Sequence, residues 1–296
     1  MTTPQAASHP IVTREKLDFG LDGDIPRHWL DNDPFKSRFF DAMSVFFPEG
    51  ERFFISCVRD FKDQISDSQL LEEVKDFTRQ EGQHGIVHRQ FNDRLKRQRI
   101  HVKSLESQTV WFLFDVLRKR LKPETTLALT AAFEHMTALM AHGFESCRVL
   151  DKADPRIRAM YTWHAIEEVE HKAVAFDVMQ KVAKVGYWRR VLPLLFTSFS
   201  FPLATLLVVN YMLTVDGFSG LKRAGIMARG LWWLYKPGGL FLPLLGHYIQ
   251  YFKPGFHPWQ TGELASYATW REVFERTGDP IAAGDAVLGP QALAKA

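Results

Sequence analysis

Hydrophobic residues recur at helical spacing along most of the chain, and they rarely alternate with polar residues as they do in a β-strand. Phe54, Val58, Phe61 and Ile65, for example, follow positions i, i+4, i+7 and i+11, which lie on one face of a helix. The pattern therefore predicts an all-α protein.

Turn-forming and helix-capping residues divide this pattern into segments. Asp33-Pro34 predicts the start of a short helix that ends near Phe47, and Pro48 predicts the start of the next one. The run Ser66-Asp67-Ser68 predicts a turn and an N-cap, followed by a long helix to about Arg97. Further helices are predicted over residues 107–121, 123–150, 155–185 and 263–276.

These segments suggest four parts of the chain. We expect an extended lead-in over residues 1–33, where Pro and Gly break any period, and a helical bundle over 34–186. An apolar helical segment is expected over 187–260, and a terminal helix with a tail over 261–296. The tail after Gly278 consists of small residues and is expected to be mobile.

The strongest chemical signal is the stretch YTWHAIEEVEH. Read as a helix, it places His164, Glu168 and His171 at i, i+4 and i+7 on one face, where two imidazoles and a carboxylate suit a metal site better than a core. Glu168 and His171 form a Glu-x-x-His pair, and Glu81 and His84 form another. Two such pairs, with a Glu from each of two further helices, describe the dinuclear site of ferritin-like four-helix bundles.

The spacing of the acidic residues tests that hypothesis independently. Glu51 and Glu81 lie thirty residues apart, and their midpoint at residue 66 falls in a predicted turn. Glu134 and Glu168 lie thirty-four apart, and their midpoint at residue 151 also falls in one. Because residues equidistant from a turn share a height in an antiparallel pair, both pairs lie about 22–26 Å from their turns. The bundle should therefore bring four carboxylates into one layer.

The predicted metal ligands come from all four helices: Glu51, Glu81, His84, Glu134, His164, Glu168 and His171. A ligating His needs an acceptor for its other N–H. We expect Glu167 to contact His84, and Gln80 to contact His171, from positions just before the two ligating Glu residues. His88 lies one turn after His84 and is expected near the site.

Two known families resemble this chain. The ligand pattern resembles non-haem diiron oxygenases of the p-aminobenzoate N-oxygenase type, which carry an additional His one turn before the last Glu-x-x-His pair, as His164 does here. Over nearly its full length, with PEGERFF at 48–54 and HAIEEVEHKAVAFDV at 164–178, the chain also resembles a bacterial family labelled predicted metal-dependent hydrolases. Ferritin-like proteins often have Arg just before the final His, whereas this chain has Glu170, which we expect to be solvated.

The first resemblance implies an oxidase or oxygenase with two Fe ions, or Mn and Fe, that uses O₂ and an external electron donor on a hydrophobic small molecule or lipid. We therefore expect an O₂-dependent oxidase or oxygenase. The alternative is a metal-dependent hydrolase, with Zn as a suitable ion, in which a dinuclear site activates water. A third alternative is a non-enzymatic metal-handling or membrane-associated protein.

An apolar stretch of twenty-five residues without a charge covers 191–215 and is long enough to cross a bilayer. Three structures remain open for it: a buried helical hairpin on the bundle, an interfacial membrane-docking element, and a membrane span. Trp and Tyr residues that follow it favour interfacial, peripheral membrane contact.

Composition limits the binding partners and the cellular compartment that we expect for this protein. A net charge of +3 is too small to indicate nucleic-acid binding. The only two cysteines, Cys57 and Cys147, lie within helical patterns and favour a reducing compartment. The N-terminus lacks the apolar core of a signal peptide, so we expect a cytoplasmic protein, with the inner membrane surface as an alternative site. A homodimer is left open.

Overall fold

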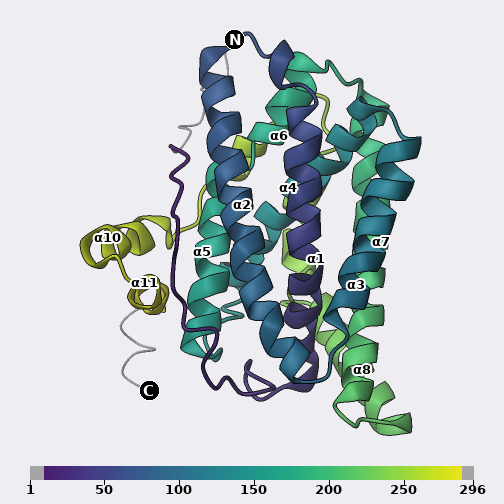
Figure 1. Cartoon of the computed structure of the whole chain (residues 1–296), viewed down its shortest axis with the longest axis vertical. Helices are drawn as coiled ribbons and strands as arrows, with labels where there is room; N and C mark the ends of the chain where they lie inside the picture. The colour runs from purple at the N-terminus through teal and green to yellow at the C-terminus, as the bar shows by residue number, and fades with distance from the viewer. Residues whose placement is uncertain (1–9, 289–296) are drawn as a thin grey trace.

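The computed structural model describes residues 10–288, and the described residues are organised as an all-α bundle without a β-sheet, which confirms the predicted fold class. Four long helices run side by side along the molecule (Figure 1). Their bounds are α1 (Pro34–Arg59), α2 (Ser68–Arg97), α4 (Pro123–Ser146) and α5 (Pro155–His171).

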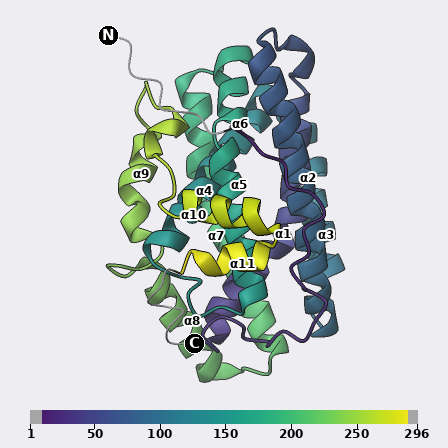
Figure 2. The ribbon, with the colours of Figure 1, turned by 90° about the vertical axis from the view of Figure 1, so that its left-hand side faces the viewer.

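The remaining elements surround these four. The π-helical segment η2 (Trp111–Arg118) continues α3 (Val102–Val110), and α7 (Tyr187–Val215) packs along α1 and α4. At the C-terminal end, α10 and α11 lie across α5 (Figure 2). The other bounds are η1 (Lys62–Gln64), α6 (Val174–Asp177), η3 (Val178–Val182), α8 (Gly220–Tyr235), η4 (Leu242–Leu244), α9 (Leu245–Gln250), η5 (Pro258–Thr261), α10 (Tyr267–Thr277) and α11 (Pro280–Ala286).

Aspartate N-caps determine where three of the bundle helices begin. Asp33 accepts a hydrogen bond from the backbone N–H of Lys36, and Asp67 accepts one from that of Gln69. Asp154 caps α5 in the same way, and Pro follows the cap in α1 and α5. Each carboxylate satisfies a first-turn N–H and interacts favourably with the helix dipole.

The prediction of a helix break at Pro48 is wrong, because α1 continues through it. A proline within a helix leaves the carbonyl four residues earlier without its N–H donor. Here that carbonyl belongs to Ser44, and the side-chain amide of Asn92 on α2 donates to it at 2.9 Å. A contact between helices therefore supplies the missing donor, and the first core helix is longer than expected.

Two predicted helices are also less regular than expected. The segment predicted over 107–121 begins earlier, at Val102, and becomes π-helical at Trp111. The helix predicted over 155–185 is interrupted directly after His171, and only then resumes as α6 and η3. Both irregularities lie close to the candidate site, where departures from α-helical geometry are common.

The two ends of the chain also differ from a simple lead-in and a mobile tail. Residues 280–286 of the expected tail form α11, which packs so closely on α5 that a Cβ on Gly284 would lie 2.7 Å from the Cα of Ala159. Residues 10–33 contain no helix, as expected, and Arg14 within them is buried. The expectations for residues 1–9 and for the tail at 289–296 lie outside the described residues.

The apolar segment forms α7, which alone among the described helices is long and apolar enough to cross a membrane. One third of its most apolar stretch of 18 residues is buried, because one face of the helix packs on the bundle. Leu194, Val209, Met212 and Leu213 on that face are fully buried, whereas Phe199 on the opposite face is 71% exposed.

A buried ion-pair network anchors the end of α7. Asp216, directly after the helix, accepts a hydrogen bond from Nε of Arg38 at 2.8 Å and lies 3.2 Å from Nε2 of His28. Burial raises the pKa of Asp216, but the hydrogen bonds from Arg38 and His28 outweigh this and hold the pKa below its ordinary value. The folded state therefore favours the ionised carboxylate.

We expect Asp216→Asn to lower the free energy of unfolding by about 2 kcal/mol at neutral pH, because it removes a charged hydrogen-bond acceptor. A lowered carboxyl pKa contributes stability above the unfolded pKa of about 4, and this contribution is lost as the pH falls below it. Urea unfolding at pH values near 7 and near 3 should therefore show a difference between variant and wild type that shrinks in acid. An equal difference at both pH values would contradict this explanation.

Candidate metal centre

The seven predicted ligands come together in the middle of the bundle. Their side chains belong to α1, α2, α4 and α5, and none of the seven residues is more than 5% exposed: Glu51, Glu81, His84, Glu134, His164, Glu168 and His171. The equal heights deduced from the spacing of the acidic residues are consistent with this arrangement, because Glu81 and Glu134 contact the same imidazole.

One half of the cluster surrounds His171. Its Nε2 lies 3.1 Å from Oε1 of Glu81, 3.3 Å from Oε2 of Glu134 and 3.7 Å from Oε1 of Glu168. These four side chains, from α2, α4 and α5, all point inward to one position.

The other half surrounds His84. Its Nδ1 lies 3.7 Å from Oε1 of Glu168. A ring nitrogen of His84 and one carboxylate oxygen each from Glu51 and Glu81 also lie within 4.8 Å of one another, close enough to share one metal ion. A second group within the same limit consists of His84, His164 and Glu168. Glu81 and Glu168 therefore belong to both halves, which is the arrangement that two neighbouring ions need.

Buried oxygen and nitrogen atoms without hydrogen-bond partners show that the cluster fits metal ions. Both carboxylate oxygens of Glu51, Glu81 and Glu134 are buried without a hydrogen-bond partner, and so are Nδ1 of His84 and Nε2 of His171. Buried polar groups are normally hydrogen-bonded. Carboxylate oxygens together with imidazole nitrogens suit Mn, Fe or Zn.

Burial and the mutual repulsion of its carboxylates determine the acid–base properties of the cluster. Burial, and then the neighbouring Glu81 and Glu168, hold the pKa values of Glu51 and Glu134 well above the ordinary value. Burial lowers the pKa of His171, but the close carboxylates of Glu134, Glu168 and Glu81 outweigh this and hold it well above its usual range. The cluster therefore retains protons that divalent ions would replace on binding.

Two side chains orient the ligating imidazoles. Oε1 of Gln80 lies 2.8 Å from Nδ1 of His171, and Oε2 of Glu167 lies 3.1 Å from Nε2 of His84. Because an amide oxygen only accepts, Nδ1 of His171 donates, and Nε2 is the nitrogen that would lose its proton when a metal ion binds. Both contacts are those expected from the sequence.

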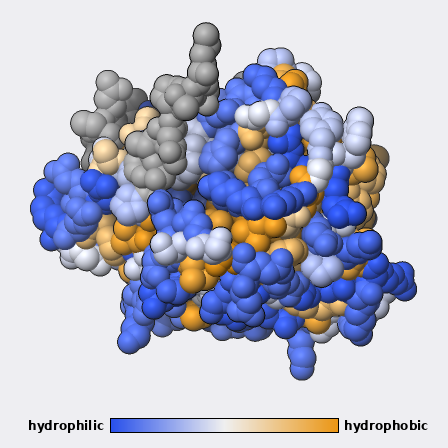
Figure 3. Space-filling model, turned by 90° about the horizontal axis from the view of Figure 1, so that it is seen from above, coloured by the Kyte–Doolittle hydropathy of each residue, from blue (hydrophilic) through white to orange (hydrophobic). Residues whose placement is uncertain are grey.

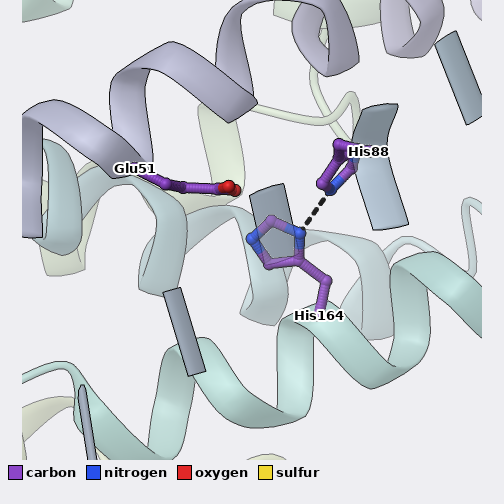
Figure 4. Close-up of side chains that lie close together, drawn as sticks. All are labelled: Glu51, His88 and His164. Atoms are coloured by element: carbon purple, nitrogen blue, oxygen red, sulfur yellow. Dashed lines mark hydrogen bonds between the residues drawn. The ribbon is translucent and has the colours of Figure 1, made fainter. Parts of the chain in front are cut away.

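His164 and His88 form a separate pair at the edge of the cluster (Figure 4). Nε2 of His88 lies 2.7 Å from Nδ1 of His164, and the other ring nitrogen of His88 lies 2.8 Å from the hydroxyl of Ser44. His164 also lies 2.9 Å from Glu168 through its Nε2, so both of its ring nitrogens already have protein partners. His88 thus supports His164, and Glu51 approaches the same pair.

The prediction that Glu170 is solvated is wrong. Glu170 is 1% exposed and pairs with Arg14, whose Nη2 donates to it at 2.8 Å. Nη1 of Arg14 also donates to Glu167 at 3.0 Å. The hydroxyl of Tyr267, the amide of Gln80 and the backbone N–H of Val12 also donate to Glu170. Where ferritin-like proteins often have Arg, directly before the final His, this chain has Glu170. The guanidinium beside that carboxylate belongs instead to Arg14 of the N-terminal segment.

Sequence reasoning missed two contributors to the site for different reasons. Arg14 lies in a segment without periodicity and about 150 residues from its partners, so it had no local signal. Thr137, whose hydroxyl donates to Glu168, lies one turn after Glu134 on the same helix, and helical spacing could have identified it. His135 on α4 instead packs between Tyr251 and Phe256, away from the cluster.

A cavity of about 410 Å³ leads to the cluster. Of the seven candidate ligands, Glu51, His164 and Glu168 line it, and aromatic and aliphatic side chains form most of its remaining wall. That wall is built by α1, α3, η2, α4 and α7, with residues that include Phe47, Phe54, Leu105, Phe112, Phe133, Met136, Phe201 and Leu207. A mostly apolar pocket with a few polar groups at one end is typical of a small-molecule site.

Comparison with known proteins bears on the chemistry of this centre. No curated protein and no solved structure shows a significant match to the chain. A family model described as "Predicted metal-dependent hydrolase" matches residues 13–262. This match overturns the preferred prediction of an O₂-dependent oxidoreductase with iron: the carboxylate and imidazole ligands suit several ions, so they could not identify redox chemistry. The chain belongs to the family of predicted metal-dependent hydrolases.

Proposed function

We propose that this protein is a hydrolase whose buried carboxylate and imidazole cluster binds two divalent ions and acts on a hydrophobic substrate in the adjacent cavity. The observation that carries the proposal is the set of unpartnered ligand atoms, from Glu51, Glu81, Glu134, His84 and His171, which converge from four helices. The family supports metal dependence and hydrolysis. The number and identity of the ions are part of the proposal.

Bound divalent ions supply Lewis-acid activation of water and of the bond to be cleaved. The chain must hold them in place, and here Gln80 and Glu167 fix the rings of His171 and His84 through their outer nitrogens. Arg14 fixes Glu167 in turn. Such outer contacts orient ligands and typically affect metal affinity by about 10–100-fold.

Glu51 is the residue best placed to move a proton. Its carboxyl group lines the cavity, and neither oxygen has a hydrogen-bond partner. With an ion bound in the cluster, Glu51 would help to hold it and could also take a proton from water. As the oxygen of water adds to the substrate and the bond to the leaving group breaks, Glu51 returns that proton to the leaving group.

The apolar cavity wall favours a substrate with a substantial hydrocarbon part. The polar side chains that line it are few, and Thr137 already donates to Glu168. A hydrophobic substrate would displace water from the cavity and place its polar, hydrolysable group against Glu51, His164 and Glu168.

The test is reconstitution of chelated protein with Zn, Mn or Fe under anaerobic conditions. We expect about two ions per chain by elemental mass spectrometry, because the cluster has two halves that share carboxylates. We also expect metal-dependent cleavage of p-nitrophenyl butyrate or p-nitrophenyl phosphate that incorporates oxygen from labelled water. Glu168→Ala should lose both the ions and the activity. Failure to bind ions, or cleavage that is equal with and without them, would overturn the proposal.

A further inference from the structure

The outward face of α7 is an uninterrupted apolar surface. Seven large side chains at helical spacing, each 44–71% exposed, form what we call the apolar face: Trp188, Leu192, Leu195, Phe196, Phe199, Leu203 and Leu207. The first and last of them lie nineteen residues apart, which corresponds to about 28 Å of helix. Scattered exposed apolar residues are ordinary, but a contiguous stripe of this length indicates an interaction surface.

Neighbouring elements extend the apolar face on both sides. Trp111 of η2 is 60% exposed and lines the cavity together with residues of α7. On the other side, Leu242, Leu245 and Ile249 of η4 and α9 are 43–52% exposed. By contrast, the end of the bundle seen in Figure 3 is largely hydrophilic, with smaller hydrophobic patches. The surface suited to an apolar partner therefore lies along the side of the molecule.

The charges around the apolar face favour an anionic partner. Residues 187–262 contain seven Lys and Arg residues but a single acidic one, Asp216, whose side chain is 1% exposed and pairs with Arg38. Arg189 lies at one end of the apolar face, and Lys222 and Arg229 lie beyond the other, all three exposed. Cations that flank an apolar helical face are typical of elements that lie in the interface of an anionic bilayer.

The packing of α7 excludes it as a free membrane span, because its inner face is part of the core. Leu194 contacts the core beside α4, and Val209 and Met212 belong to the core that includes α1. Pulling α7 into a bilayer would expose these side chains' partners. The helix can instead lie with its outer face in the lipid while its inner face remains on the bundle.

The cavity connects this surface to the metal centre. Leu207 belongs to the apolar face and also lines the cavity, and Trp111 of η2 lines the cavity too. The buried side chains of Glu51, His164 and Glu168 line the inner part of the cavity. An acyl or alkyl chain entering between η2 and α7 would meet mostly apolar side chains, with Gln108, Thr109 and Ser200 as polar exceptions, before its polar group reached the carboxylates.

We propose that the apolar face docks on the surface of an anionic lipid bilayer and that the cavity accepts a membrane amphiphile directly from it. The docking step stands on the surface alone, whereas the assignment of the amphiphile as substrate rests on the proposed hydrolase function. This assigns α7 as an interfacial element and names lipids with an acyl or alkyl chain as the substrate class.

The experiment is co-flotation of full-length, metal-loaded protein with phosphatidylcholine vesicles, with and without phosphatidylglycerol. We expect binding that requires the anionic lipid and weakens with salt. The double variant Leu192→Gln/Phe199→Gln should bind at least about tenfold more weakly, because both side chains would be buried in lipid. Ile86→Gln, a similar exposed apolar position on α2 away from the apolar face, is the matched control and should bind as wild type does.

Hydrolysis assays separate the two proposals. The double variant should cleave soluble p-nitrophenyl butyrate as wild type does, but should cleave a long-chain ester embedded in vesicles much more slowly. Vesicle binding without any hydrolysis would retain the docking and overturn the hydrolase. Hydrolysis without vesicle binding would overturn the docking alone. The docking would also be overturned if wild type formed a dimer that the double variant lost, because a second copy would then cover the apolar face.

Discussion

Glu51→Gln is expected to stabilise the metal-free protein and to lower metal-dependent activity by at least about a hundredfold. Removing a residue that only orients a ligand already costs about 10–100-fold in metal affinity or activity, so loss of a ligand should cost at least as much. Neither carboxylate oxygen of Glu51 has a hydrogen-bond partner, so the amide loses no bond. Burial and the nearby carboxylates of Glu81 and Glu168 disfavour the charge of Glu51. Removing that charge should raise the free energy of unfolding of the chelated protein by about 1–3 kcal/mol.

The pH dependence of this gain has a definite sign. The folded-state pKa of Glu51 is raised, so the folded protein binds more protons than the unfolded chain above the ordinary carboxyl pKa. The stability of wild-type apo protein should therefore fall as the pH rises above about 4.5, towards the raised folded-state pKa. Glu51→Gln should remove its part of that decline.

Denaturant unfolding of chelated and metal-loaded protein, together with turnover, measures both effects. The matched control is Glu49→Gln, two residues earlier, where the carboxylate makes a partly exposed ion pair with Arg52. That substitution should change stability by less than about 1 kcal/mol in either state. If Glu51→Gln destabilised the apo protein as much as the metal-loaded protein, Glu51 would be structural and its assignment as a ligand would fail.

Arg14→Ala is expected to lower the free energy of unfolding by about 3–5 kcal/mol, because it leaves the buried carboxyl groups of Glu167 and Glu170 without their cation. The side chain of Arg14 is 4% exposed, and those of its partners Glu167 and Glu170 are fully buried. Burial already raises the pKa of Glu167 to about 8 against the opposing effect of Arg14. Without Arg14 the contact between Glu167 and His84 should change, and metal affinity should fall by about 10–100-fold.

Urea unfolding and metal titration of three variants test this role. Arg27→Ala is the matched control, since Arg27 pairs with Asp216 but its side chain is 49% exposed. Adding Glu170→Gln to Arg14→Ala should recover part of the lost stability, because one unpaired charge disappears. A loss in Arg14→Ala no larger than in Arg27→Ala, or no recovery in the double variant, would show that the N-terminal segment does not support the site.

Much of the candidate centre could be predicted because its signals are local. The Glu-x-x-His pairs lie within single helices, and helical spacing alone places Glu81 beside His84 and Glu168 beside His171. The shared height of the four carboxylates also followed from the sequence, because antiparallel helices with a known turn have a nearly fixed rise per residue. Metal binding by these residues stays a prediction until ions are measured.

Features that depend on contacts between distant segments could not be predicted in this way. Periodicity indicated a break at Pro48, yet Asn92 on a neighbouring helix satisfies the carbonyl that the proline leaves free. Position on the helical stripe indicated a solvated Glu170, yet Arg14 covers it. The choice between oxygenase and hydrolase failed for a chemical reason, because one set of carboxylate and imidazole ligands serves several metals and reactions.

The sequence by itself determined the all-α class and the residues that form one carboxylate and imidazole layer, because both depend on spacing within helices. It also marked residues 191–215 as apolar, without showing which surface they would cover. The tertiary structure alone decided that one face of α7 completes the core while the other stays exposed, and that the cavity runs between α7 and η2 to the cluster. Those properties arise from packing between segments far apart in the chain, which no local pattern encodes.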